Sequence, residues 1–140
     1  HVTHYAGIDQ LDDFLGASDA VINVLPSTAA TTGLLTAERL AHFVPGSIFV
    51  NVGRGTVLAS EADLIDALDN GPIAAAVLDV TEPEPPADDS PLWTHPAITL
   101  TPHISGMTQV RSAAKLIASN VARLRAGEQP APMLDRSRGY

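Results

Sequence analysis

Short apolar segments alternate along the chain with amphipathic segments of helix length. The apolar segments predict strands at 20–25, 47–52, 73–80 and 97–101. Apolar positions recurring every three or four residues predict helices at 37–43, 61–69 and 108–126. This alternation is typical of a parallel sheet with crossover helices. The run 73–80 is apolar at nearly every position, so we expect it to be buried on both faces of the sheet.

The predicted helices carry characteristic residues at their ends. Thr36 precedes the first helix, and Ser60 precedes the second, with Asp63 placed as in a capping box. Asn70-Gly71 is expected to end the second helix in a left-handed conformation, and Gly127 to end the third.

The segment 82–91 is rich in proline, which lacks an N–H donor and favours extended conformations in the preceding residue. It is therefore expected to be neither helix nor central strand. Its composition alone is typical of a solvated linker. Because it lies between two predicted strands, we expect an ordered loop across the top of the sheet.

Composition limits the partners that the protein can have. The 140 residues include 16 acidic and 8 basic side chains, and the resulting formal charge of −8 disfavours nucleic acid and anionic membranes. Without cysteine, the chain can form neither disulfides nor thiolate sites. No apolar run has the length of a membrane span and no leader pattern is present, so we expect a cytoplasmic protein.

Polar residues that could take part in binding or catalysis follow three of the predicted strands. Arg54 follows the second strand, Asp79 and Glu84 end and follow the third, and His103 follows the fourth. Singly, each has an ordinary structural explanation, as a turn residue, a cap, a solvated charge or a packed histidine. Open parallel sheets bind ligands at the carboxyl ends of their strands, and independent structural residues have no reason to gather there. A joint functional site is therefore favoured.

The sequence lacks the motifs of three other kinds of site: a metal site, a serine hydrolase and a complete dinucleotide-binding loop. The five histidines show neither paired helical spacing nor an HExxH pattern, so we expect no metal site. The G-x-S-x-G motif of serine hydrolases is missing. Gly53-Arg54-Gly55 begins like a dinucleotide-binding glycine loop, but Leu58 stands where the last glycine belongs. We expect any such loop to lie upstream of this sequence.

The order of motifs from about residue 20 to residue 106 resembles the D-isomer-specific 2-hydroxyacid dehydrogenases. The similar segments are Leu25-Pro26, Thr31-Thr32-Gly33-Leu34-Leu35, Asn51-Val52-Gly53-Arg54-Gly55, Leu78-Asp79-Val80 with a following Glu-Pro, Pro91-Leu92-Trp93 and Thr101-Pro102-His103-Ile104. The ending Leu134–Tyr140 is similar to that of the A-type glyoxylate/hydroxypyruvate reductases within this family. One departure is an additional residue between Arg54 and Asp79, which we expect to lie in the loop before Ser60.

The resemblance implies a fold and a division into domains. The fold class is α/β, a parallel-sheet Rossmann-like half domain followed by a long C-terminal helix. Residues 1–106 would form the C-terminal half of a dinucleotide-binding domain. Residues 107–140 would form a return helix and tail that pack toward a substrate domain absent from this sequence. The chain would then be part of a longer protein, and it would be inactive by itself.

The resemblance also implies roles for individual residues. Arg54 would hold the carboxylate and keto oxygen of the substrate, His103 would donate the proton, and Glu84 would be the partner of His103. Glu84 is preferred over Glu82 because it lies five residues beyond Asp79, as the catalytic glutamate of the family does. The residues expected to bind the cofactor are Pro26, Val52, Gly53, Arg54, Asp79, His103 and Ser105.

The function implied is reduction of a small 2-keto acid, of the glyoxylate or hydroxypyruvate type, to the D-2-hydroxy acid. The cofactor would be NAD(P)H, with NADP favoured by the similarity to the A-type reductases, and the complete protein would be a homodimer. An alternative is a non-enzymatic dinucleotide-sensing module, and a second is a purely structural α/β domain. The joint presence of Arg54, Glu84 and His103 favours the enzyme, because a sensor needs no proton donor.

Overall fold

The computed structural model describes residues 2–135 and divides the chain into two compact units. The first unit runs to Ser105 and contains the sheet, and the second begins at Gly106 and contains one long helix. Because the two units are separate bodies, each is described by itself.

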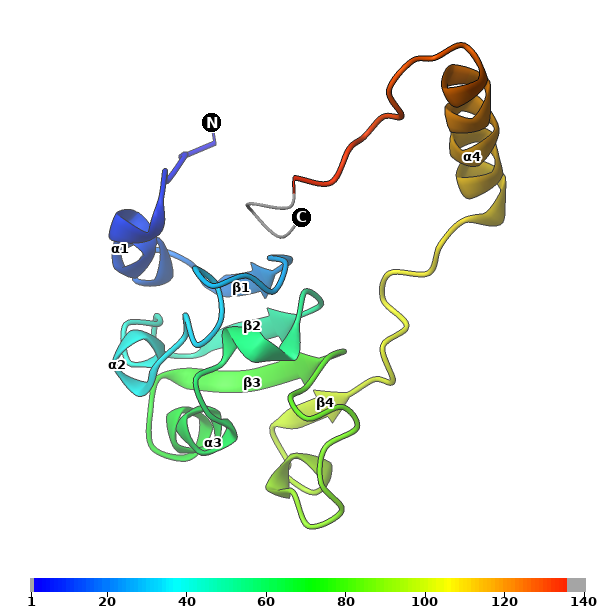
Figure 1. The fold of residues 1–140 in the computed structure, drawn as a ribbon. Helices are drawn as coiled ribbons and strands as arrows, with labels where there is room; N and C mark the ends of the chain where they lie inside the picture. Colours follow the sequence, from blue (N-terminus) through cyan, green and yellow to red (C-terminus); the bar gives the residue numbers. More distant parts are fainter. Residues whose placement is uncertain (1, 136–140) are drawn as a thin grey trace. The chain divides into compact units, whose positions relative to one another are not determined.

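The first unit is built on a sheet of four parallel strands in the order β1-β2-β3-β4 (Figure 1). The strands are β1 (Ala20–Asn23), β2 (Ser47–Asn51), β3 (Ile73–Leu78) and β4 (Ile98–Leu100). The predicted parallel α/β architecture is confirmed. Strand β1 ends two residues earlier than expected. The side chain of Asn23 accepts a hydrogen bond from the N–H of Leu25, and Pro26 has no N–H with which to continue the ladder.

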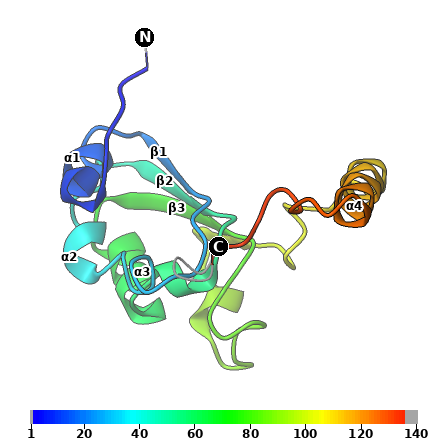
Figure 2. The same ribbon diagram turned by 45° about the horizontal axis from the view of Figure 1, so that its top comes forward.

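Three helices, α1 (Leu11–Leu15), α2 (Ala37–Leu40) and α3 (Glu61–Asp69), lie on one face of the sheet (Figure 2). Single 3-10 turns lie at Ile8–Gln10, Gly55–Val57 and Pro91–Trp93. The sequence pattern missed the first helix and all three turns. Helix α2 is shorter than the predicted 37–43, because His42 and Phe43 bond to carbonyls three residues back.

The hydrophobic core lies between the helices and the face of the sheet that they cover. Leu15, Leu40 and Leu64 of the three helices are completely buried against Phe49 of β2. Phe43 packs edge-on against Phe49, with ring centroids 6.0 Å apart. This core fixes the sheet and therefore the positions at which its strands end.

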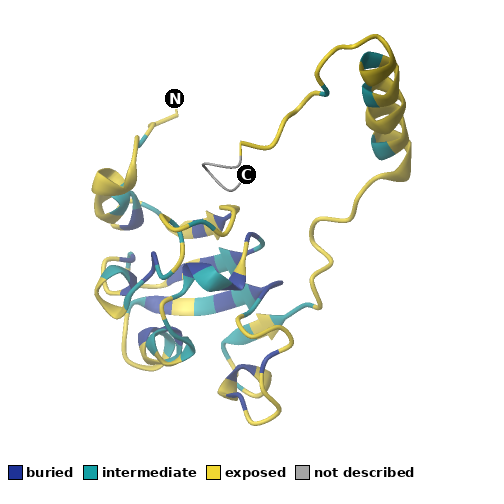
Figure 3. Cartoon of the chain, viewed as in Figure 1, coloured by how far each residue is buried: buried dark blue, intermediate teal, exposed yellow. Residues whose placement is uncertain are grey.

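The expectation that helices cover both faces of the sheet is wrong for this unit. Burial alternates along β1, and Ile22 is 60% exposed on the uncovered face, as is Ile48 of β2 at 41% (Figure 3). In β3, Ala74 is exposed, and Val77 is only half-buried. No helix between residues 2 and 105 packs on that face (Figure 2). An apolar strand sequence thus did not reveal that only one of its faces is covered here.

The predicted helix caps are mostly confirmed. The Ser60 hydroxyl accepts a hydrogen bond of 3.0 Å from the Asp63 N–H, and Thr36 caps α2 in the same way. The predicted left-handed exit at Asn70-Gly71 is wrong, because Asn70 has φ −125° and neither residue has a positive φ. Gly71 is needed for space, since a Cβ there would lie 2.7 Å from the Ala67 carbonyl oxygen.

The second unit contains α4 (Val110–Arg125), slightly shorter than the predicted 108–126. Gly127 ends this helix with φ 75°, as predicted, and the Glu128 N–H returns to the Arg123 carbonyl at 2.9 Å. The ending that is similar to that of the A-type reductases begins at Leu134, and most of it, residues 136–140, lies outside the described residues. No helix in the described part of the chain is long and apolar enough to cross a bilayer.

Candidate active site

The register of the sheet aligns the last residues of its strands. Asn23 pairs with Asn51, Asn51 with Leu78, and Leu78 with Leu100. The segments that follow these residues therefore leave from the same edge of the sheet. This edge carries every residue for which the sequence predicts a role, namely Pro26, Val52, Gly53, Arg54, Asp79, Glu84, His103 and Ser105.

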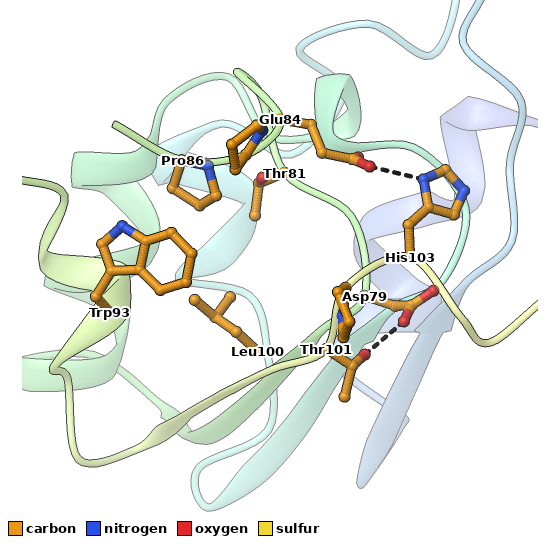
Figure 4. Close-up of a pocket in the computed structure, with 10 residues that line it drawn as sticks. Asp79, Thr81, Glu84, Pro86, Trp93, Leu100, Thr101 and His103 are labelled. Atoms are coloured by element: carbon orange, nitrogen blue, oxygen red, sulfur yellow. Dashed lines mark hydrogen bonds and ion pairs between the residues drawn. The ribbon is translucent and has the colours of Figure 1, made fainter. Parts of the chain in front are cut away.

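The structure brings together His103 and Glu84, from loops 19 residues apart in the chain. His103 Nδ1 lies 2.8 Å from Glu84 Oε1 (Figure 4). Both side chains are about half exposed, at 48% and 42%. With Nδ1 donating to the carboxylate, Nε2 is the ring nitrogen left for another molecule. Glu82, the other acidic residue of the loop, has no contact of this kind with His103.

Asp79 is buried beneath this pair, with 3% of its surface exposed. Its carboxylate accepts a hydrogen bond from the hydroxyl of Thr101 (Figure 4). It also accepts from the hydroxyl of Ser105 and from the N–H groups of Ile104 and Ser105. Burial raises the pKa of the Asp79 carboxyl, but these hydrogen bonds outweigh it and hold the pKa well below its usual range. The loop they anchor holds His103 at φ 53°, a left-handed conformation that costs a non-glycine residue energy.

Arg54 follows β2 in an extended conformation, with φ −140° and an exposed side chain. Its Nη1 donates to the Gly53 carbonyl oxygen at 2.7 Å, and no ion pair between residues 2 and 135 includes it. The flanking glycines make room for the protein itself. A Cβ on Gly53 would lie 2.7 Å from the Leu25 carbonyl oxygen, and one on Gly55 would lie 2.1 Å from the Thr81 backbone. The guanidinium is thus an available cation on a tightly packed turn.

The remaining predicted cofactor residues lie beside this turn or beside the His103 loop. Pro26 is exposed, and its carbonyl accepts a hydrogen bond from the Thr31 hydroxyl at 2.6 Å. Val52 is half-buried, whereas Ser105 is exposed and its hydroxyl donates to Asp79. Pro26 and Ser105 are therefore accessible to a ligand at this edge. The Asp79 carboxylate differs, since its roughly four lone-pair sites already accept four protein hydrogen bonds.

Sequence reasoning missed two features of the site. The first is a cavity of about 330 Å³ that has the Glu84–His103 pair on one side and Pro86 and Trp93 on the other (Figure 4). The second is a pair of buried amides, Asn23 and Asn51, at the ends of β1 and β2. A polar residue ending an apolar strand was the available signal for the amides. The cavity had none, because it depends on how the loop 82–91 folds.

One negative finding applies to the described part of the chain. No three His, Asp or Glu side chains between residues 2 and 135 are grouped closely enough to hold a metal ion. The side chains present at this edge include a guanidinium, an imidazole and a carboxylate, groups that can bind an anion and move a proton.

Solved structures resemble this chain over most of its length. A D-isomer specific 2-hydroxyacid dehydrogenase from Xanthobacter autotrophicus Py2, in complex with NADPH and MES, is 45% identical with a TM-score of 0.91. The match covers 97% of this chain and 56% of that one. An NADPH-dependent glyoxylate/hydroxypyruvate reductase from Sinorhizobium meliloti, in complex with NADP and sulfate, is 33% identical with a TM-score of 0.86, over 94% of this chain and 43% of that one.

Curated relatives agree with this result. Glyoxylate/hydroxypyruvate reductase A of Serratia proteamaculans is 42% identical over 139 residues, and that of Salmonella paratyphi B is 41% identical. Each match covers 99% of this chain but 44% of the relative, so the chain spans less than half the length of the reductases it matches. The family model for the NAD binding domain of D-isomer specific 2-hydroxyacid dehydrogenases matches residues 2–105. The chain therefore belongs to the D-isomer specific 2-hydroxyacid dehydrogenase family.

Proposed function

We propose that this chain is the C-terminal part of a reductase that converts a small 2-keto acid, such as glyoxylate or hydroxypyruvate, to the D-2-hydroxy acid with NADPH. The names of its relatives at about 41% identity support the substrate, and the NADPH and NADP complexes of similar structures support the cofactor. The observation that carries the proposal is the His103–Glu84 pair, at 2.8 Å, on the same sheet edge as an unpaired Arg54.

Each of these three side chains has a chemical task in the proposed reaction. Arg54 binds the carboxylate of the keto acid, because a planar guanidinium with several N–H donors can hold two oxygens at once. His103 Nε2 donates its proton to the keto oxygen as the carbonyl carbon becomes a hydroxyl-bearing carbon. Glu84 accepts from His103 Nδ1, which orients the ring and stabilises its charged form. The nicotinamide cofactor, when bound, supplies the hydride.

We assign the cofactor contacts of this part of the protein to Pro26, Val52, Gly53 and Ser105. Pro26 follows β1 beside the Arg54 turn, Val52 and Gly53 belong to that turn, and Ser105 belongs to the His103 loop. Asp79 contributes by holding the backbone of the His103 loop, since its carboxylate is already fully engaged. Residues 1–106 would then be the C-terminal half of a dinucleotide-binding domain, with 107–140 as the return helix and tail. The complete protein would be a homodimer.

The test is NADPH consumption with glyoxylate and hydroxypyruvate by a full-length protein that carries this chain. Turnover is expected, with a preference for NADPH over NADH, whereas the isolated 140-residue chain is expected to be inactive because half a site cannot orient two reactants. A full-length protein that binds NADPH but reduces neither acid would instead be a dinucleotide sensor. The His103–Glu84 pair argues against that alternative, because cofactor sensing needs no proton donor.

A further inference from the structure

Two asparagine side chains are buried side by side at the ends of β1 and β2. Asn51 is completely buried, and Asn23 is 6% exposed. The two residues face each other in the sheet register, each as the last residue of its strand. A buried amide is costly unless its donors and acceptors are paired, so the hydrogen bonds of this pair show what it holds.

Asn51 binds both sides of the turn that carries Arg54. Its Oδ1 accepts from the Gly53 N–H at 3.2 Å, and its Nδ2 donates to the Arg54 carbonyl oxygen at 3.1 Å. The same Oδ1 accepts from Asn23 Nδ2 at 2.8 Å. A flipped amide would place its NH₂ against two donors and its oxygen against a carbonyl, so the network fixes its orientation. The turn is therefore held by one side chain with a single satisfactory orientation.

Asn23 links the Asn51 amide to the loop that follows β1. Its Oδ1 accepts from the Leu25 N–H at 3.1 Å. The turn and the loop are also in close contact, because a Cβ on Gly53 would lie 2.7 Å from the Leu25 carbonyl oxygen. Between residues 2 and 135, the hydrogen bond of the Arg54 side chain is to the carbonyl of Gly53 alone. The location of the guanidinium thus depends on a backbone that the two amides hold.

We propose that Asn51 is a positioning residue that sets Arg54 for the substrate carboxylate, with Asn23 coupling this turn to the Pro26 loop. The inference rests on the proposed function, because it assigns Arg54 to the keto acid. It goes further by predicting that substrate binding depends on a side chain that never touches the substrate. If the Asn51 amide had only a structural role, its replacement would impair folding or raise KM for glyoxylate and for NADPH equally. If it positions Arg54, its replacement should raise KM for glyoxylate alone.

Replacing Asn51 by aspartate distinguishes a positioning role from a purely structural one, because the hydrogen bonds of the new side chain depend on whether it is protonated. A protonated carboxyl keeps an O–H that can donate to the Arg54 carbonyl, while its other oxygen accepts from Asn23 and Gly53. An ionised carboxylate has no donor and places a second oxygen against that carbonyl. Two charged residues are hydrogen-bonded to Asn51 through their backbone: Arg54, whose carbonyl accepts from the amide, and Asp79, whose N–H donates to the Asn51 carbonyl. Both are present in wild type and variant, so the comparison isolates residue 51.

The experiment measures KM for glyoxylate and for NADPH in the full-length protein, for wild type and Asn51→Asp, from about pH 8 to about pH 5.5. At the upper end, KM for glyoxylate is expected to rise roughly 10- to 100-fold, the effect of misplacing a substrate clamp, with KM for NADPH changed less than about 2-fold. The ratio of variant to wild-type kcat/KM should recover as the pH falls. Asn120→Asp is the matched control, because it keeps the oxygen that accepts from the Ala131 N–H, and it should follow wild type throughout.

The possible outcomes distinguish this inference from the proposed function. Wild-type turnover with an unchanged KM for glyoxylate in Asn51→Asp, or with parallel increases in both KM values, would overturn the inference and leave the proposed function standing. A wild type that reduces neither glyoxylate nor hydroxypyruvate would overturn both, and if it reduces only hydroxypyruvate, KM for that acid replaces KM for glyoxylate in the comparison. If Asn51→Asp does not fold, Asn23→Asp takes its place, since it keeps the acceptor for the Leu25 N–H and loses only the donor to Asn51. Asn23→Asp is expected to raise KM for glyoxylate selectively, and an unchanged value would overturn the inference equally.

Discussion

Replacing Asp79 by asparagine tests how strongly the buried carboxylate anchors the His103 loop. The substitution keeps the size of the side chain and one acceptor oxygen, but it turns the other oxygen into an NH₂ group. The Ser105 hydroxyl can reverse and accept from this group, whereas the Ser105 N–H is left facing another donor. The loss is therefore one charge-assisted hydrogen bond, together with one backbone N–H, on the exposed residue Ser105, that is left facing a donor.

The magnitude follows from these two losses. A hydrogen bond to a charged group contributes about 1.5–3 kcal/mol, and the unpaired N–H costs about 1 kcal/mol, the lower end of its range because Ser105 is exposed, so Asp79→Asn should lower the free energy of unfolding by about 2.5–4 kcal/mol. The effect should depend on pH. The folded-state pKa of Asp79 is depressed, so its contribution is full above the unfolded value of about 4 and is lost as the pH falls below it. The stability difference between wild type and variant should narrow accordingly in acid.

The assay is urea unfolding of the 140-residue chain, followed by circular dichroism and by fluorescence of Trp93, its only tryptophan. Asp88→Asn is the control, because Asp88 is an exposed residue of the loop 82–91 and should change stability by less than about 0.5 kcal/mol. A difference for Asp79→Asn that is as small as the control's, or that stays constant from about pH 7 to about pH 3, would contradict the anchoring argument.

Three further substitutions test the site and its packing. Arg54→Lys should lower kcat/KM for glyoxylate roughly 100-fold in the full-length protein, because an ammonium cannot reproduce a two-oxygen clamp, and near-normal kinetics would remove Arg54 from its assigned role. His103→Ala should lower kcat about 10²–10⁴-fold while fluorescence titration shows little change in NADPH affinity, and a loss below about 10-fold would mean that another group donates the proton. Gly55→Ala should destabilise the chain by about 3 kcal/mol in urea unfolding, because its Cβ would lie 2.1 Å from the Thr81 backbone. Gly106→Ala, which has open space around it, should be neutral, and equal effects of the two changes would contradict the packing argument.

The sequence by itself determined the architecture and the edge at which the site lies. Short apolar segments such as 47–52 have the length of strands and need at least one buried face, and their alternation with amphipathic helices favours a parallel sheet. Local signals were equally reliable at Ser60, whose hydroxyl meets a helix N–H three residues away. Because parallel strands end at one edge, the positions of Arg54 and His103 in the sequence were enough to place both there.

Only the tertiary structure decided which groups touch. It brought Glu84 rather than Glu82 to His103, engaged Asp79 fully within the protein and joined Asn23 to Asn51. It also left one face of the sheet uncovered, although the strand sequences predicted burial on both. The periodicity of apolar residues indicates which side of a single helix or strand is buried, but it does not indicate which residues of other segments that side contacts. A hydrogen bond between two loops depends on distances of about 3 Å that many distant packing contacts set together.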